Sequence, residues 1–153
     1  MSAVAESTDL EAFLEAFDQN WRQGGPARAF VERFRPLLDP QIRLVQPQVP
    51  TLVGPEAFER GFVGPLFELM PDARGAVRGW TARDDVLHIE VDVMGTLGGR
   101  RVVLRSCDRI TLRDGRIAER VAFVDPGPLL RAVALHPRTW PTFIRTQVRQ
   151  RRR

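Results

Sequence analysis

Cysteine and histidine are scarce in this sequence, and among its 19 acidic residues Asp108 is the one whose position suggests acid–base chemistry. The chain has one cysteine, Cys107, and two histidines, His88 and His136. We therefore expect no disulfide framework, no metal site and no cofactor, and the sequence contains no phosphate-binding loop or dinucleotide fingerprint. The strand register described next places Asp108 among Ile89, Leu104 and Ile110, where burying a carboxylate is costly unless it has a partner or a purpose.

The side of the sheet that Asp108 faces follows from the hairpin around Gly98-Gly99. A two-residue turn there places Asp108 opposite Ile89 on a face that is otherwise almost entirely apolar. A slip of one residue would bury Arg105 and Arg109 on that face instead. We therefore predict that Asp108 points to the covered, inner side of the sheet.

The facing of the next strand, residues 116–124, has two interpretations. A three-residue loop at 113–115 turns Arg120 and Ala122 inward and opposes Arg120 to Asp108. A two-residue loop instead turns inward the apolar residues Ile117, Val121 and Phe123. The apolar content favours the second interpretation, and the family resemblance described below favours the first.

The elements that position these residues are predicted to be helices first and strands afterwards. Hydrophobic spacing predicts an opening helix from Thr8, with Glu11 completing a capping box. A second short helix opens at Pro26, a short strand covers Ile42–Val45, and a third helix opens at residues 54–56. A period of two then predicts an antiparallel meander with strands at 76–82, 86–97, 100–112 and 116–124. A short helix at 129–135 follows, and 140–150 is either a helical turn or a flexible arm.

The composition is that of one domain, with 153 residues, of which 43% are apolar and 27% charged. We predict a single domain over residues 1–137 and an Arg-rich tail over 138–153. The first 125 residues carry a net charge of −3, whereas the last 28 carry seven Arg and no acid. We expect no nucleic-acid or membrane partner and a cytoplasmic location, because the body is not basic and neither a signal peptide nor a membrane span is evident.

The order of these elements resembles the nuclear transport factor 2-like superfamily, and within it the SnoaL-like polyketide cyclase domains. The supporting motifs are Arg-Asp-Gly-Arg-Ile at 113–117, Val-Asp-Pro at 124–126 and Leu-Leu at 129–130, and the resemblance covers about residues 8–136. It implies an α+β fold, a cone-shaped barrel in which N-terminal helices pack on a curved antiparallel sheet around a deep pocket. It also implies a homodimer through the outer face of the sheet. Members of this superfamily carry out several reactions, so the fold leaves the function open.

The functional residues of related enzymes are retained only in part. Asp108 matches the acidic oxyanion donor of ketosteroid isomerase. The general-base position of that enzyme falls at Gln46, and its oxyanion tyrosine falls near Phe17. The catalytic aspartate of SnoaL-type cyclases falls at Ala122, and the catalytic triad of limonene epoxide hydrolase is absent.

Two functions are compatible with what remains. The first is a cofactor-free isomerase, cyclase or lyase-type enzyme on a small hydrophobic carbonyl or polyketide-like substrate, with Asp108 as acid or base beside Arg120. The second is a non-catalytic module for hydrophobic-ligand binding or dimerisation. In both cases the expected partners are a small hydrophobic molecule and a second copy of the chain. The residues expected to line the pocket are Phe17, Trp21, Phe34, Gln46, Phe62, Phe67, Trp80, Ser106 and Ala122.

Overall fold

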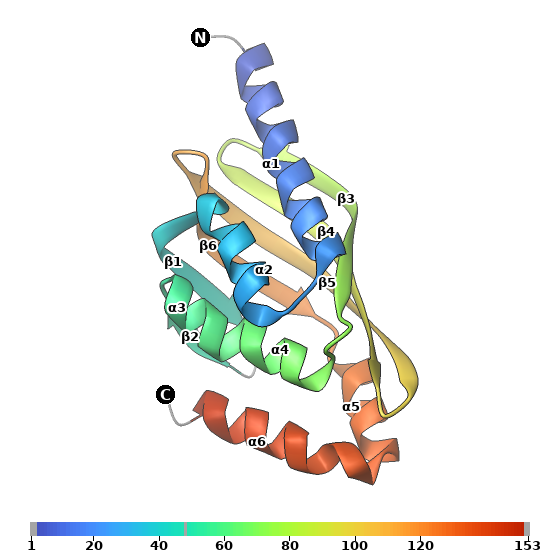
Figure 1. Ribbon diagram of the computed structural model, residues 1–153. Helices are drawn as coiled ribbons and strands as arrows, with labels where there is room; N and C mark the ends of the chain where they lie inside the picture. The colour runs from blue at the N-terminus through green and yellow to red at the C-terminus, as the bar shows by residue number, and fades with distance from the viewer. Residues whose placement is uncertain (1–2, 48, 152–153) are drawn as a thin grey trace.

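The structure is a computed structural model that describes residues 3–47 and 49–151, with helices and strands arranged as in Figure 1. The N-terminal part contains two helices, two strands and two further helices. These are α1 Ala3–Gln23, α2 Ala27–Phe34, β1 Leu38–Gln46, β2 Val49–Val53, α3 Pro55–Phe58 and α4 Gly64–Leu69. The C-terminal part contains four long strands and two helices. These are β3 Arg74–Arg83, β4 Val86–Leu97, β5 Arg100–Arg113, β6 Arg116–Val124, α5 Gly127–Leu135 and α6 Trp140–Arg151.

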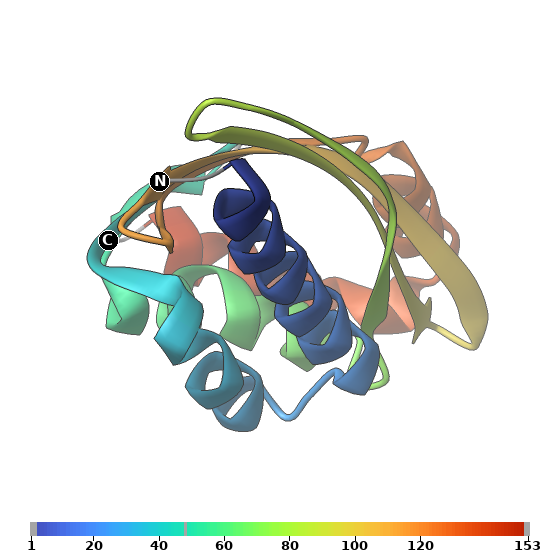
Figure 2. The same cartoon turned by 90° about the horizontal axis from the view of Figure 1, so that it is seen from above.

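The strands form one six-stranded sheet in the order β2-β1-β6-β5-β4-β3. Neighbouring strands are antiparallel, except that β1 runs parallel to β6. Figure 2 shows that the sheet curves over the helices and remains open rather than closing into a full barrel. The predicted α+β fold, with N-terminal helices packed on a curved sheet, is therefore confirmed.

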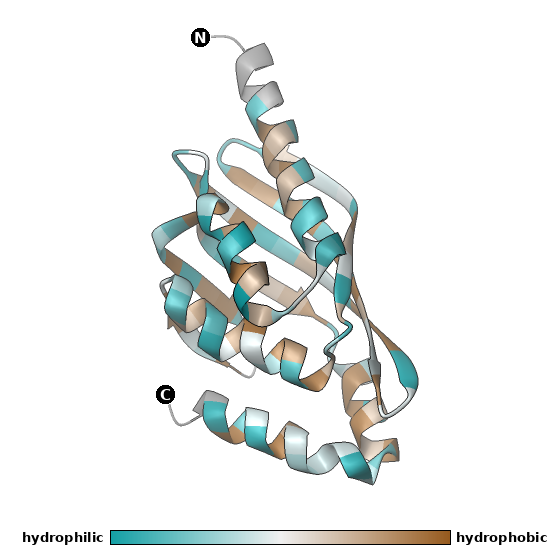
Figure 3. Ribbon diagram, viewed as in Figure 1, coloured by the Kyte–Doolittle hydropathy of each residue, from teal (hydrophilic) through white to brown (hydrophobic). Residues whose placement is uncertain are grey.

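The first helix packs on the concave side of the sheet through one apolar face. Its buried apolar residues recur with helical spacing, as expected for a helix that buries one stripe, and they are Phe13, Leu14, Phe17 and Trp21. Figure 3 shows how apolar and polar residues alternate along the helices and strands. The predicted start at Thr8 is wrong, because α1 already begins at Ala3 and Thr8 lies within it.

The region between the first strand and the meander contains more structure than the sequence predicts. Strand β1 is longer than the expected Ile42–Val45, and β2 follows it as an edge strand, where Pro50 is tolerated. The third predicted helix divides into α3, a π-helical turn at Glu59–Val63, and α4. The missing side chain at Gly61 allows this turn to approach β2, since a Cβ there would lie 2.7 Å from a methyl carbon of Leu52.

The C-terminal segment returns to the body of the domain. A single turn at Pro137–Thr139 connects α5 to α6, and α6 contacts α4 and β2. The segment from Trp140, predicted as either a helical turn or a flexible arm, is thus a helix. Among the described helices, none combines the length and the apolar character that crossing a membrane requires.

Candidate ligand-binding site

Strands β4 and β5 place Asp108 inside the fold, as the hairpin register predicts. Leu97 pairs with Arg100 across the Gly98-Gly99 turn, and Asp108 pairs with Ile89. The Asp108 side chain is completely buried. Ser106, two residues earlier, lies on the same inner face because side chains alternate along a strand.

A bulge in β6 decides the facing of the last strand and reconciles the two interpretations of its hairpin. The turn itself is the tight one, with Arg113 opposite Arg116, so Ile117 points inward and is buried. The register then shifts beyond Ile117. A bulge inserts one residue and reverses which side chains face the core. As a result, Arg120 and Ala122 are also buried.

Because of the same register shift, the expected pairing of Asp108 with Arg120 across β5 and β6 is wrong. Asp108 lies opposite Ala122, and Arg120 lies opposite Ile110, rather than Asp108 opposite Arg120. Val121 and Phe123 point to the outer face, where Phe123 is 59% exposed. The three-residue loop that we considered would have produced the same inward facing without a bulge.

Arg120 and Asp108 form a buried ion pair. The Arg120 Nε and Nη2 atoms lie 2.7 and 2.6 Å from Asp108 Oδ2. The Ser106 hydroxyl donates a hydrogen bond to the other carboxylate oxygen, Oδ1. The guanidinium carbon also lies 5.1 Å from the ring centre of Phe62 and 5.8 Å from that of Trp21, within cation–π range.

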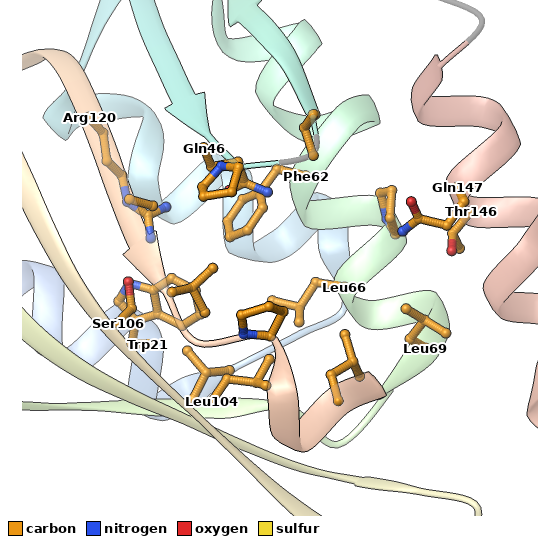
Figure 4. Close-up of a pocket in the computed structure, with 18 residues that line it drawn as sticks. Trp21, Gln46, Phe62, Leu66, Leu69, Leu104, Ser106, Arg120, Thr146 and Gln147 are labelled. Atoms are coloured by element: carbon orange, nitrogen blue, oxygen red, sulfur yellow. The ribbon is translucent and has the colours of Figure 1, made fainter. Parts of the chain in front are cut away.

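The guanidinium of Arg120 borders a cavity of about 160 Å³ between the sheet, α4 and α6. Its walls are mainly apolar and include Leu66, Leu69, Val93, Leu104 and Val124. Figure 4 shows Arg120, Trp21 and Ser106 on one side of this space and Thr146 and Gln147 of α6 on the opposite side. Among the described residues that line it, none is Asp, Glu or His.

Six of the residues predicted from the sequence line this cavity: Trp21, Gln46, Phe62, Ser106, Arg120 and Ala122. Phe17, Phe34 and Phe67 are instead packed in the aromatic core beneath it. Trp80 is 44% exposed on β3. Asp108 is not among the lining residues and lies behind Ser106 and Arg120, which separate its carboxylate from the space.

The contribution of α6 to the cavity was not predicted from the sequence. Thr146 is 1% exposed, and both Thr146 and Gln147 line the space. Glu68 of α4 forms ion pairs with Arg145 and Arg149 of this helix, at 3.6 and 3.2 Å. The Arg-rich composition of the segment indicated a solvated end and concealed these contacts.

The remaining reactive side chains lie elsewhere. Cys107 points to the outer face, where partial burial and the nearby carboxylates of Asp108 and Glu90 raise the pKa of its thiol. His136 at the end of α5 bonds through its ring Nδ1 to the carbonyl of Ala132. Among the described residues, no group of three or more His, Cys, Asp or Glu side chains is arranged to hold a metal ion.

Residues 10–120 match the model of the SnoaL-like domain family. The chain belongs to the SnoaL-like family. Search of the curated proteins gave no match. The resemblance to this family, indicated by the order of elements in the sequence, is thus confirmed.

Solved structures with the same fold include several polyketide cyclase candidates. A protein described as a SnoaL-like polyketide cyclase from Jannaschia sp. CCS1 is 22% identical, with a TM-score of 0.69 over 84% of this SnoaL-like chain and 92% of its own. IdmH from Streptomyces antibioticus, described as a polyketide cyclase, is 17% identical, with a TM-score of 0.67 over 81% and 97%. TerC, co-crystallised with polyporic acid, is 18% identical, with a TM-score of 0.69 over 82% and 98%. At these identities the likeness establishes the fold alone.

Proposed function

We propose that this SnoaL-like chain binds a small hydrophobic carbonyl or polyketide-like molecule in the cavity beside Arg120. The observation that carries the proposal is a mainly apolar cavity with a buried, neutralised cation at one side. Apolar walls with a few convergent polar groups are the usual composition of a small-molecule site. The polyketide cyclases and the polyporic acid complex among proteins of the same fold support this ligand class.

The size of the cavity limits the part of the ligand that is enclosed. A volume of about 160 Å³ is close to the ~150 Å³ of an engineered apolar cavity that accepts benzene. We therefore expect one ring of the ligand to be enclosed. The rest of a larger molecule lies outside this volume.

Binding is tested with a panel of one- and two-ring ketones, measured by calorimetry and by the rise in melting temperature. The Ala122→Leu variant fills the space that the ligand needs, since Ala122 lines the cavity. The matched control is Ala82→Leu, because Ala82 is exposed near the end of β3. The proposal expects binding by the native chain and the control and loss of binding by Ala122→Leu. It fails if no ketone binds, or if Ala122→Leu binds as the native chain does.

A second candidate function, catalysis of proton transfer, is favoured by the hydrogen bond from Ser106 to Asp108. Ser106 lines the cavity, and its hydroxyl donates a hydrogen bond to Asp108, which lies on the side of Ser106 away from the cavity. In such a reaction the Ser106 oxygen takes a proton from the carbon next to the ligand carbonyl while the hydroxyl proton passes to Asp108. The electron pair remains in the enolate, whose oxygen is stabilised by the cation of Arg120. Return of the proton to another carbon gives an isomerase. Attack of the enolate carbon on a second carbonyl, whose oxygen then takes the proton back through Ser106, gives a cyclase.

Exchange of the α-protons of a bound ketone in D₂O separates the two candidates. Proton NMR measures the exchange in the native chain and in Ser106→Ala and Ser106→Thr. If the chain catalyses proton transfer, the α-protons exchange faster than in buffer alone. The exchange rate then falls strongly in Ser106→Ala and is partly restored in Ser106→Thr. Exchange at the buffer rate in a chain that binds the ketone favours the binding function without catalysis.

A further inference from the structure

The indole N–H of Trp21 is a buried donor for which the described part of the chain offers no acceptor. Trp21 is 2% exposed, and its Nε1 atom has no hydrogen-bond partner. Buried donors in folded proteins are nearly always paired, because an unpaired one loses its hydration without compensation. Trp21 also lines the cavity, together with Ser106 and Arg120 (Figure 4), and the Arg120 guanidinium carbon lies 5.8 Å from the centre of the Trp21 ring.

Arg120 has hydrogen-bonding capacity beyond its ion pair. Its Nε and Nη2 atoms are directed to one oxygen of Asp108, at 2.7 and 2.6 Å. A guanidinium carries five N–H donors in one plane. The Nη1 amino group is not engaged by Asp108 in the described contacts, and the Arg120 side chain borders the cavity.

The charge around these donors is balanced. Asp108 neutralises Arg120, and no other charged side chain is among the described residues that line the cavity. A ligand carboxylate would therefore bring an uncompensated negative charge into apolar surroundings, which is costly. An uncharged carbonyl oxygen accepts hydrogen bonds without that cost.

We propose that the Trp21 Nε1–H and the Nη1 group of Arg120 together hold the uncharged carbonyl oxygen of the ligand. These two donors make the cavity select neutral ketones over carboxylates and over hydrocarbons of the same shape. This inference rests on the proposed function, since it assigns the atoms that orient a ligand within the same cavity. Trp21 is thereby a specificity-determining residue, and Asp108 positions Arg120 without touching the ligand.

The test uses three probes of nearly one shape: acetophenone, α-methylstyrene, in which a CH₂ group replaces the oxygen, and benzoate. The Trp21→Phe variant removes the N–H and keeps an aromatic ring, and Trp80→Phe is the control because Trp80 is exposed outside the cavity. We expect Trp21→Phe to lower the affinity for acetophenone about three- to tenfold, the loss typical of one hydrogen bond. The affinity for α-methylstyrene is expected to change much less, and Trp80→Phe is expected to change neither.

A second measurement in the native chain does not depend on the folding of a variant. The chain has three indole N–H groups, those of Trp21, Trp80 and Trp140, which give separate signals in a ¹⁵N–¹H spectrum. Acetophenone is expected to move the Trp21 signal downfield, as a new hydrogen bond does, while α-methylstyrene is not. The other two signals serve as internal references, since Trp140 already donates to the Val133 carbonyl and Trp80 is exposed.

The outcomes distinguish this inference from the function on which it rests. If acetophenone binds but the Trp21 signal does not move downfield and Trp21→Phe binds equally well, the inference is wrong and the cavity is still a ligand site. Benzoate binding more tightly than acetophenone overturns the selection for neutral ligands. If the native chain binds no ketone of the panel, acetophenone included, the proposed function itself is removed, and the inference falls with it.

Discussion

Arg120 reaches Asp108 diagonally across two strands, because the register opposes Arg120 to Ile110 and Asp108 to Ala122. The Nη2–Oδ2 distance of 2.6 Å shows that a long side chain spans this diagonal fully. The carboxylate is completely buried, whereas the guanidinium borders the cavity. As a result, the positive charge of Arg120 borders the ligand site, whereas the negative charge of Asp108 lies behind it.

We predict that Asp108→Asn destabilises the fold strongly. The substitution leaves the Arg120 cation buried without its counter-charge, and removal of one partner of a buried pair costs about 3–5 kcal/mol. For a domain of this size that corresponds to a fall in melting temperature of roughly 6–20 °C. Thermal and urea unfolding measure the loss.

The double variant Asp108→Leu/Arg120→Met is the control for this interpretation. It removes both charges and replaces them with apolar side chains, so it should be more stable than Asp108→Asn. An Asp108→Asn variant that melts with the native chain would show that the pair contributes little. In that case Asp108 is retained for a reason other than the burial of Arg120.

The pairing of β4 with β5 could be predicted residue by residue from the sequence, whereas the facing of β6 could not. Gly98-Gly99 marks a two-residue turn, and the alternation on both sides admits one register that keeps Arg105 outside. The bulge after Ile117 has no comparable signature, because a single inserted residue requires no glycine or proline. Arg120 therefore faces inward although the tight turn at 114–115 pointed to the opposite parity.

Other parts of the site depend on contacts between distant segments. Strand β2 contains Pro50, which argues against a strand unless the strand lies at an edge, and the sequence does not reveal that edge. The wall formed by α6 comes from a segment more than 70 residues after α4, where Arg145 and Arg149 pair with Glu68. The separation of Asp108 from the cavity depends on side-chain directions that hydrophobic periodicity does not specify.

We predict that the chain forms a homodimer through the outer face of the sheet. Met94, Val103 and Val121 are only partly covered there, and Phe123 is 59% exposed. Apolar side chains left uncovered on a sheet face favour self-association. Sedimentation at micromolar concentration is expected to show about twice the chain mass of 17.4 kDa.

The Val103→Glu variant is expected to sediment as a monomer, since it places a charge among these apolar side chains on the outer face of the sheet. Gln19→Glu on the exposed side of α1 adds the same charge outside the sheet and should remain dimeric. A native chain that sediments as a monomer, or a dimer that Val103→Glu leaves intact, contradicts the prediction.

Acid is expected to weaken the attachment of the loop before β3 to the end of β4. Asp72 accepts a hydrogen bond from the Thr96 backbone N–H at 2.9 Å, and this bond lowers the pKa of the Asp72 carboxyl. A lowered folded-state pKa adds stability above the unfolded-state value near 3.8, and that stability is lost as the pH falls through the folded value. The difference in urea midpoint between the native chain and Asp72→Asn should therefore be larger at pH 6 than at pH 3. A difference that stays constant with pH would remove Asp72 from the acid response.

A chain that ends at Pro137 tests the predicted division at residues 137 and 138. Of the α6 side chains that the structure describes, Thr146 alone is fully buried, and Trp140 is 47% exposed. We therefore expect cooperative unfolding within about 2–4 °C of the full-length chain, the shift that one kcal/mol produces in a domain of this size. Ketone affinity is expected to fall by more, because the truncation removes the wall formed by Thr146 and Gln147. A much larger drop in melting temperature would show that α6 belongs to the folding unit, and unchanged affinity would show that the ligand does not reach this wall.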